Sequence, residues 1–295
     1  MSDIALRFHK DVLVLSAPPV VALERLGVDT AADLEFTLLF EPDTVEEAYR
    51  LEAMGGTQCL VAATAGLTPA QLARVRMEEQ GPQLARAALE ALAPFKPQHV
   101  LVELGPCGLP LDPSAKASLM EHRDQYARAG RMFDGLEFDG FFLNGFGDCT
   151  NLKCALMGLA KVNDAPVFAS VDVDSAGMLP SGETLEDAVR VAEELGAAVV
   201  GFQTAADADE AAKLCARACA AGTLELPVMA QMAVEPGGAY GNADALADAA
   251  AVLCAAGAQF LRASGQATAA CTGALVAATL GMDVARNVGD ATGQE

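Results

Sequence analysis

Eight short apolar runs, each followed by a segment with the spacing of an amphipathic helix, recur along this chain of 295 residues. Runs of this kind are apolar on both faces, as buried parallel strands covered by helices must be. The runs are Asp11–Ala17, Gln58–Thr64, His99–Gly105, Gly140–Gly145, Pro166–Val173, Ala198–Thr204, Leu226–Met232 and Gln259–Ser264. Eight alternations in this length predict an α/β protein, a single-domain (β/α)8 TIM barrel over residues 1–283 with a flexible C-terminal tail at 284–295.

The segments between these runs carry helix signals. Thr68 is expected to cap one long helix that runs from Ala70 to Ala93, and Asp43 or Thr44 to cap a helix that ends at Met54. In a TIM barrel the groups that bind and react lie at the C-terminal ends of the strands. Candidate site residues are therefore sought there.

The composition excludes several classes of protein. A net charge of −21 argues against a nucleic-acid partner, because binding phosphates needs clustered Lys and Arg. No apolar stretch reaches the length of a membrane span, and the first residues, MSDIALRFHKD, lack the layout of a signal peptide. The eight cysteines form no Cys-x-x-Cys pair and indicate reduced thiols. Together these features predict a cytoplasmic protein without a membrane partner.

Polar side chains gather where the apolar runs end. The candidate ligand-binding residues are Thr64, Glu103, Asn144, Asp172, Gln203, Thr204, Gln231, Arg262 and Ser264. This mixture of amides, hydroxyls and charges suits a small polar ligand, with Arg262 as a two-pronged carboxylate binder. Alternatively, Glu103 and Arg262 form a buried ion pair that closes the barrel. The sequence leaves both interpretations open.

Other residues with chemical potential show less specific patterns. Asp172 and Asp174 stand two apart on one strand face and, with Glu103, would suit a Mg²⁺ ion, although exposed loop acids are the simpler interpretation. Cys107 and Cys149 follow strand ends, where a thiol would reach the pocket. Both possibilities stay open at this point.

Two further groups are expected to be structural. Cys215 and Cys219 share one face of a helix on the outside of the barrel, where packing is the expected role. His9 and His122 lie away from strand ends, and His99 begins a strand at the opposite end of the barrel. No histidine is therefore placed for base catalysis.

The order and spacing of several segments resemble the homocysteine S-methyltransferase family. The segments are Arg50–Thr64, Leu101–Leu111, Asp139–Leu156, Pro166–Gly182, Ala197–Thr204 and Gly257–Leu275. Members are zinc-dependent barrels, among them the homocysteine-binding module of cobalamin-dependent methionine synthase and betaine–homocysteine methyltransferase. In such enzymes three cysteine thiolates hold Zn²⁺, which lowers the pKa of the homocysteine thiol and makes it a nucleophile. The resemblance covers nearly the whole chain.

The resemblance breaks at the residues that this chemistry needs. The three zinc positions of the family fall on Thr204, Ser264 and Gly265. The family's Asp-Gly-Ala-Met-Gly turn after the first strand is replaced by Ser16–Pro19, and its fourth-strand Glu, which helps hold the amino-acid substrate, by Asn144. The resemblance therefore implies a relative that kept the scaffold and lost the zinc site, so that zinc is expected to be absent.

Two functions of different classes follow from the resemblance. The first is a methyltransferase-like enzyme that acts on or binds a small polar methyl donor or acceptor without the usual three-cysteine zinc site. The second is a catalytically inactive relative that serves as a small-molecule-binding or complex subunit. The resemblance also implies an indirect link to corrinoid or folate methyl carriers, with a corrinoid or methyl-carrier protein as a partner. A homo-oligomer is a further expected assembly.

Overall fold

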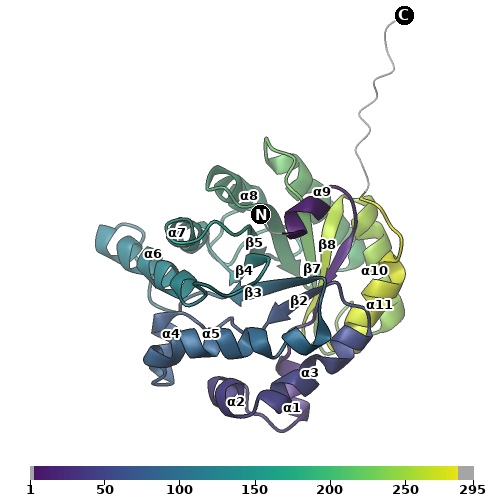
Figure 1. The fold of residues 1–295 in the computed structure, drawn as a ribbon. Helices are drawn as coiled ribbons and strands as arrows, with labels where there is room; N and C mark the ends of the chain where they lie inside the picture. The colour runs from purple at the N-terminus through teal and green to yellow at the C-terminus, as the bar shows by residue number, and fades with distance from the viewer. Residues whose placement is uncertain (1–2, 285–295) are drawn as a thin grey trace, which may run out of the picture.

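Eight parallel strands close into a barrel in the computed structural model of the chain, which describes residues 3–284 (Figure 1). The strands are β1 (Leu13–Leu15), β2 (Cys59–Ala62), β3 (His99–Leu104), β4 (Gly140–Phe146), β5 (Val167–Asp172), β6 (Val199–Thr204), β7 (Val228–Val234) and β8 (Ala258–Gly265). They pair in chain order, with β1 beside β8. Each apolar run thus holds a strand, and the predicted (β/α)8 barrel is confirmed. The predicted tail lies outside the described residues apart from Val284.

Helices connect the strands and cover the outside of the barrel (Figure 1). The α-helices are α1 (Val20–Arg25), α2 (Leu34–Phe40), α3 (Pro42–Met54), α4 (Pro69–Arg74), α5 (Gly81–Glu90), α6 (Lys116–Arg131), α7 (Cys149–Leu159), α8 (Leu185–Glu194), α9 (Ala208–Ala221), α10 (Ala243–Ala255) and α11 (Ala269–Thr279). Short 3-10 helices are η1 (Asp3–Arg7), η2 (Glu78–Gln80) and η3 (Ala93–Phe95). Within residues 3–284 no helix is both long and apolar enough to cross a membrane.

Side-chain caps explain where several helices begin. Asp148, Asp207 and Asn242 each accept the backbone N–H of the residue three positions further on. Thr184 and Asp187 form a capping box at the start of α8. Because each of these helices follows a strand, the caps also fix the loops around the C-terminal mouth of the barrel.

Two segments differ from the sequence-based expectation. The single helix expected from Ala70 to Ala93 is instead α4, η2 and α5 in succession. Arg76 adopts a left-handed φ of 59° just after α4, and Pro82 in the first turn of α5 lacks the N–H that an uninterrupted helix would need. Helix α2 was not expected because no side chain caps it, and α3 begins at Pro42, ahead of the expected caps.

The N-terminal half of the barrel interior is filled by apolar side chains. Alternate residues of the strands point inward and form one buried cluster of Leu13, Leu15, Cys59, Val61, Leu101, Phe142, Phe168, Val199, Met229 and Phe260. Ile4 of η1 joins this cluster, and Phe8 packs edge-to-face on Phe168 and Phe260 with ring centroids 6.2 and 6.0 Å away. A ligand would therefore enter from the C-terminal mouth.

Candidate functional site

A polar layer lies above this apolar cluster, on the next inward positions of the strands. Glu103, Asn144, Gln231 and Arg262 each stand two residues beyond a member of the cluster, and therefore share its inward face. Ser170 of β5 has the same place after Phe168. The alternation of the strands thus changes from apolar to polar at one level of the barrel.

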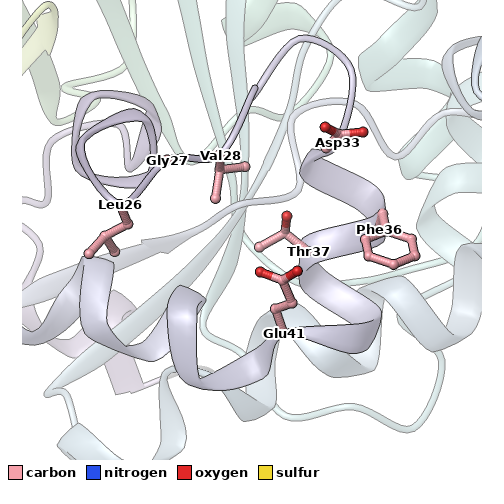
Figure 2. A pocket seen from close by; sticks show the side chains of 7 residues that line it. All are labelled: Leu26, Gly27, Val28, Asp33, Phe36, Thr37 and Glu41. Carbon is pink, nitrogen blue, oxygen red and sulfur yellow. The ribbon is translucent and has the colours of Figure 1, made fainter.

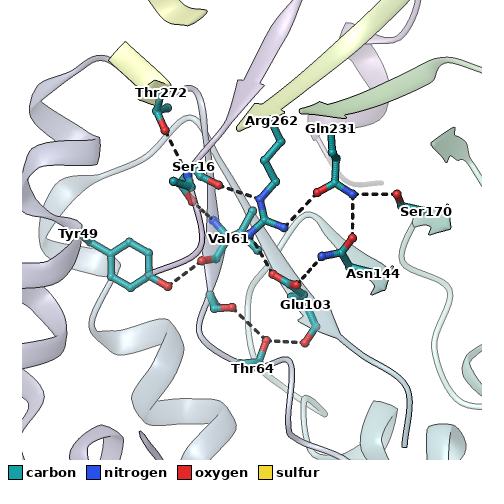
Figure 3. A network of polar contacts seen from close by, with 12 residues as sticks. Ser16, Tyr49, Val61, Thr64, Glu103, Asn144, Ser170, Gln231, Arg262 and Thr272 are labelled. Carbon is teal, nitrogen blue, oxygen red and sulfur yellow. Dashed lines mark hydrogen bonds and ion pairs between the residues drawn. The ribbon is translucent and has the colours of Figure 1, made fainter. Parts of the chain in front are cut away.

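Arg262 is the centre of the polar layer (Figure 3). Its side chain is fully buried, and Nη2 forms an ion pair with Glu103 Oε2 at 3.0 Å. Nε donates to the Ser16 carbonyl at 2.9 Å, and Nη1 donates to Gln231 Oε1 at 3.5 Å. The guanidinium carbon also lies 5.0 Å from the centroid of the Phe142 ring. These contacts offset the cost of burying the charge.

Two amides complete the layer (Figure 3). Gln231 Nε2 donates to Asn144 Oδ1 at 2.7 Å and to Ser170 Oγ at 2.8 Å. Asn144 Nδ2 donates to Glu103 Oε1 at 2.8 Å, so both carboxylate oxygens of Glu103 have partners. The bonds form a closed circuit from Arg262 through the amides and back, and such a circuit holds its members in one geometry.

The circuit already uses the Arg262 nitrogens that were expected to bind a ligand carboxylate. A ligand carboxylate would have to displace Glu103 from Nη2 to use that nitrogen. The Glu103 side chain is 13% exposed and that of Arg262 is 0% exposed, so a ligand reaches Glu103 first. The ion pair is present in the structure, and carboxylate binding by Arg262 stays a prediction.

The rim above the circuit is acidic. Asp172 at the end of β5 is half-buried, and its Oδ1 accepts a hydrogen bond from Gln203 Nε2 at 3.1 Å. Burial raises the pKa of the Asp172 carboxyl. A cavity of about 290 Å³ adjoins it, lined by Asp172, Val173, Asp174, Met178, Leu179 and Pro180. The rim therefore offers a carboxylate beside a space of ligand size.

Asp174 has a different role from its neighbour. It is exposed, and its Oδ1 accepts the backbone amides of Ala176 and Met178 at 2.9 and 2.8 Å, so it shapes the loop after β5. Among residues 3–284 no three His, Cys, Asp or Glu side chains are grouped so as to hold a metal ion. Asp172, Asp174 and Glu103 are therefore not grouped as ligands for the alternative Mg²⁺ site.

The three hydroxyl candidates divide into two kinds. Thr64 Oγ1 donates to the Glu103 carbonyl at 2.8 Å, and Thr204 Oγ1 accepts the Ala206 amide at 3.2 Å, so both support the backbone of the mouth. Ser264 is buried, and its Oγ has no hydrogen-bond partner within the described chain. A buried hydroxyl left in this state is unusual.

The zinc ion of the family does not fit the residues present. Thr204 and Ser264 offer neutral hydroxyls in place of thiolates, and Gly265 offers no donor. Gly265 also adopts a φ of 65°, and a Cβ atom there would lie 2.8 Å from the Val234 carbonyl oxygen. A cysteine at this position would need the backbone to move. Zinc-activated thiolate chemistry therefore has no ligand set here.

The two thiols that follow strand ends are buried. Cys107 is 0% exposed and Cys149 is 5% exposed. Burial raises the pKa of both thiols, and the nearby Glu183 carboxylate helps raise that of Cys149 to about 12. Both thiols are therefore protonated at neutral pH and are poor nucleophiles.

Cys215, Cys219 and His99 lie apart from the mouth. Cys215 and Cys219 of α9 each place Sγ 3.7 Å from the Ala256 carbonyl at the end of α10, in the interface between these helices. His99 begins β3 at the opposite end of the barrel, with Nδ1 3.8 Å from Asp139. These positions agree with the structural roles expected for them.

Sequence reasoning missed two members of the circuit. Ser16 contributes its carbonyl to Arg262, and its hydroxyl accepts the Val61 amide at 2.9 Å. Ser170 binds Gln231. The strand alternation would have revealed Ser170, two residues before Asp172, whereas a contact made by the Ser16 backbone has no signal in the sequence.

A further missed residue, Glu52 of α3, is a carboxyl buried just outside the barrel. Its two oxygens accept the hydroxyls of Thr272 and Thr57, each at 3.2 Å. Thr272 Oγ1 in turn accepts the amide of Ala17, the neighbour of Ser16 (Figure 3). Burial raises the pKa of the Glu52 carboxyl to about 7. A chain of contacts thus connects Glu52 with the edge of the polar circuit.

Comparison with known proteins agrees with this geometry. A profile of the homocysteine S-methyltransferase family matches residues 21–278. The methionine synthase of Mycobacterium tuberculosis is 27% identical over 178 residues, which cover 56% of this chain and 15% of that protein. The chain therefore spans only a small part of the length of this relative.

Two crystal structures of the homocysteine methyltransferase MmuM from Escherichia coli have the same fold. The oxidized form gives a TM-score of 0.78 at 18% identity over 93% of this chain and 98% of MmuM. The metallated form gives 0.74 at 20% identity over 92% and 98%. The structural likeness shows the fold, and the profile match over most of the length shows the family. The chain belongs to the homocysteine S-methyltransferase family.

Proposed function

We propose that the mouth of the barrel binds a small polar methyl donor or acceptor with a cationic group, and that it does so without the family's three-cysteine zinc site. The observation that carries this proposal is the distribution of charge. Arg262 is neutralised by Glu103, whereas no Lys or Arg of the described residues forms an ion pair with Asp172. An ammonium or sulfonium group would supply the cation that Asp172 lacks.

The surrounding groups suit such a ligand. Gln203 holds Asp172 from one side, and the raised pKa of that carboxyl means that its ionised form is poorly solvated. A cation bound beside Asp172 would favour the ionised form and lower this pKa. Ser264 Oγ and the partly exposed Asn144 provide hydrogen-bonding atoms for the uncharged part of the ligand.

The residues at the tips of β6 and β8 carry no thiolate, so they act by holding the ligand and not by activating a thiol. They bind and orient the ligand and exclude water from it. Methyl transfer from a sulfonium or quaternary ammonium donor depends mainly on alignment with the acceptor, because the positive charge already makes the methyl carbon electrophilic. An acceptor used here would have to be nucleophilic without the help of a zinc-bound thiolate.

A second candidate function is a binding subunit without turnover. The observation that favours it is the replacement of all three zinc cysteines by Thr204, Ser264 and Gly265. Both candidates share the same ligand site and differ only in whether a methyl group moves. The alternatives are therefore separated by turnover, not by affinity.

Isothermal titration calorimetry with a small panel tests the proposal. The panel contains homocysteine with and without zinc, methionine, a sulfonium amino acid and a trimethylammonium carboxylate. We expect the cationic compounds to bind, and Asp172→Asn to weaken them about tenfold or more, as loss of one charge-assisted contact does. Asp209→Asn, an exposed acid on α9, is the matched control and should leave affinity unchanged.

Two results would refute the proposal. Homocysteine binding that requires zinc would show that the family's metal site persists. Equal affinity of the wild type and Asp172→Asn for the cationic compounds would remove the role of the carboxylate. Mass spectrometry of the protein mixed with a cationic donor and homocysteine as acceptor then decides between enzyme and subunit, since only an enzyme moves the methyl group from the donor to the homocysteine thiol.

We also propose a methyl-carrier protein as partner, with the methyl group connected indirectly to a corrinoid or folate carrier, and a cytoplasmic location. The similarity to part of a methionine synthase supports the methyl-carrier partner. The eight free cysteines support the cytoplasmic location. A homo-oligomer is the other proposed assembly. Sizing with light scattering, alone and with a purified corrinoid protein, tests both assemblies.

A further inference from the structure

Exposed apolar side chains gather on α1, α2 and α3. Phe36 and Phe40 of α2 are 48% and 63% exposed, and their rings lie against each other with centroids 4.7 Å apart. Leu26 beside α1 and Leu51 of α3 are 46% and 63% exposed. These helices lie together at the lower edge of Figure 1. Grouped exposure of large apolar residues is typical of an interaction surface.

A groove between the end of α1 and α2 adjoins the aromatic pair (Figure 2). Its volume is about 310 Å³, and its lining, here called the α1–α2 groove, consists of Leu26, Gly27, Val28, Asp33, Phe36, Thr37 and Glu41. Leu26 also borders a second cavity of about 300 Å³ that reaches Leu51. The apolar side chains and the two cavities therefore form one continuous surface.

The same surface is acidic. Its exposed carboxylates are Glu24, Asp29, Asp33, Glu41, Asp43 and Glu47, against two exposed cations, Arg25 and Arg50. Arg50 is already paired with Glu47 at 2.6 Å. Within residues 3–284 no cation forms an ion pair with Asp33 or Glu41, the two acids of the α1–α2 groove. The groove thus combines an apolar wall with two uncompensated carboxylates.

The chemistry of the groove selects among possible occupants. A second copy of this chain carries the same net charge of −21, and a two-fold interface through this face would bring like carboxylates together. An anionic lipid surface is repelled for the same reason. A Lys or Arg side chain would satisfy both features, because its stem would pack on the apolar wall of the groove while its charged head would reach Asp33 or Glu41.

We propose that the α1–α2 groove and the Phe36–Phe40 pair dock a basic amphipathic segment of another protein, with a Lys or Arg in the groove and an apolar residue on the aromatic rings. Large aromatic side chains at such a surface contribute most of the affinity, and the acids contribute orientation and a faster association. The α1–α2 groove shares no lining residue with the cavity beside Asp172 at the mouth. The proposal therefore holds whether or not the barrel transfers a methyl group.

Fluorescence anisotropy with a designed peptide tests the proposal on the full chain. The probe is a helical peptide with leucines along one face and arginines beside them. We expect the double substitution Phe36→Ser with Phe40→Ser to weaken binding about tenfold or more, and Asp33→Asn with Glu41→Gln to weaken it about threefold or more. The matched control, Glu194→Gln with Asp209→Asn, removes two exposed acids elsewhere and should change affinity less than about twofold.

Circular dichroism and thermal unfolding confirm that the variants fold, as expected for exposed positions. Equal losses in the groove and control variants would mean that net charge alone attracts the peptide, which overturns the proposal. So would light scattering that shows a wild-type dimer converted to a monomer by the Phe36 and Phe40 substitutions, since the face would then bind a second copy. An affinity unchanged by the serine substitutions overturns it as well.

Discussion

The two halves of the barrel interior are built from the same strands but held by different forces. The N-terminal half consists of apolar side chains sealed by Ile4 and Phe8. The C-terminal half is a hydrogen-bonded circuit around Arg262, in which each bond depends on a particular partner. The N-terminal half tolerates any well-packed set of apolar side chains, whereas the C-terminal half requires particular hydrogen-bonding pairs.

Stability and ligand binding therefore depend on different halves of the barrel interior. Apolar packing supplies stability without choosing a ligand, and the polar circuit supplies a fixed floor for the mouth. The circuit uses Arg262 internally, so the charge that is left for a ligand is the negative charge of Asp172. Substitutions in each half test this division.

The largest effect is expected for Arg262→Met. It leaves the Glu103 carboxylate buried without its cation, and should lower the free energy of unfolding by about 4 kcal/mol. Urea denaturation measures this. Adding Glu103→Gln removes the unpaired charge and should recover about half of the loss, since Gln still accepts from Asn144. A double variant no more stable than the single one would show that the Arg262–Glu103 ion pair does not stabilise the C-terminal half of the barrel.

In the N-terminal half, Met229→Ala should cost about 3 kcal/mol, because it creates a cavity among fully buried side chains. Ligand affinity at the mouth should not change, in contrast to substitutions in the circuit. Met157→Ala, at a position 39% exposed, is the control and should stay within about 0.5 kcal/mol of the wild type. Loss of ligand binding in a folded Met229→Ala variant would show that the N-terminal half contributes to ligand binding as well as to stability.

Glu52→Gln tests the contact chain that reaches the circuit from outside. The folded-state pKa is about 7 against an ordinary 4.5. The unfolded chain ionises first, so the stability associated with neutral Glu52 is fully present below pH 4.5 and is lost as the pH rises through 7. Gln cannot ionise, so the variant should be more stable than the wild type by about 3 kcal/mol at pH 8, and not at pH 4.5. Parallel stability curves for the two proteins between these pH values would disprove the shifted pKa.

The smallest effect is expected for Gly265→Ala, about 1–2 kcal/mol. Its left-handed φ disfavours any side chain, and the new Cβ would press on the Val234 carbonyl. Gly237→Ala is a matched control, since Gly237 has a φ of 73° but open space around it. Thermal unfolding should show a larger loss for Gly265. Equal losses would remove the steric obstacle to a cysteine at the zinc position.

The sequence predicted what depends on local pattern. The strands follow from apolar runs, and the mouth residues from their place at the strand ends. The pairing of Glu103 with Arg262 was one of two interpretations, because the choice of partner depends on side chains separated by 159 positions. The break near Arg76 was missed, since a helix interior with good propensity gives no local warning of a left-handed residue.

The exposed Phe36–Phe40 pair was missed for a related reason. Residues 34–40 read as a short segment without a capping side chain, and only the structure shows that Phe36 and Phe40 stay exposed. Exposure of an amphipathic helix depends on what packs against it, which the sequence of that helix does not contain.

Zinc analysis of the intact protein tests the loss of the metal site most directly. The chain is equilibrated with one equivalent of zinc and with homocysteine, desalted, and examined by elemental analysis and zinc-edge X-ray absorption. With Thr204, Ser264 and Gly265 at the ligand positions, we expect far less than one zinc per chain and no zinc–sulfur scattering from cysteine. One tightly held zinc with cysteine sulfur in its coordination shell would contradict this conclusion.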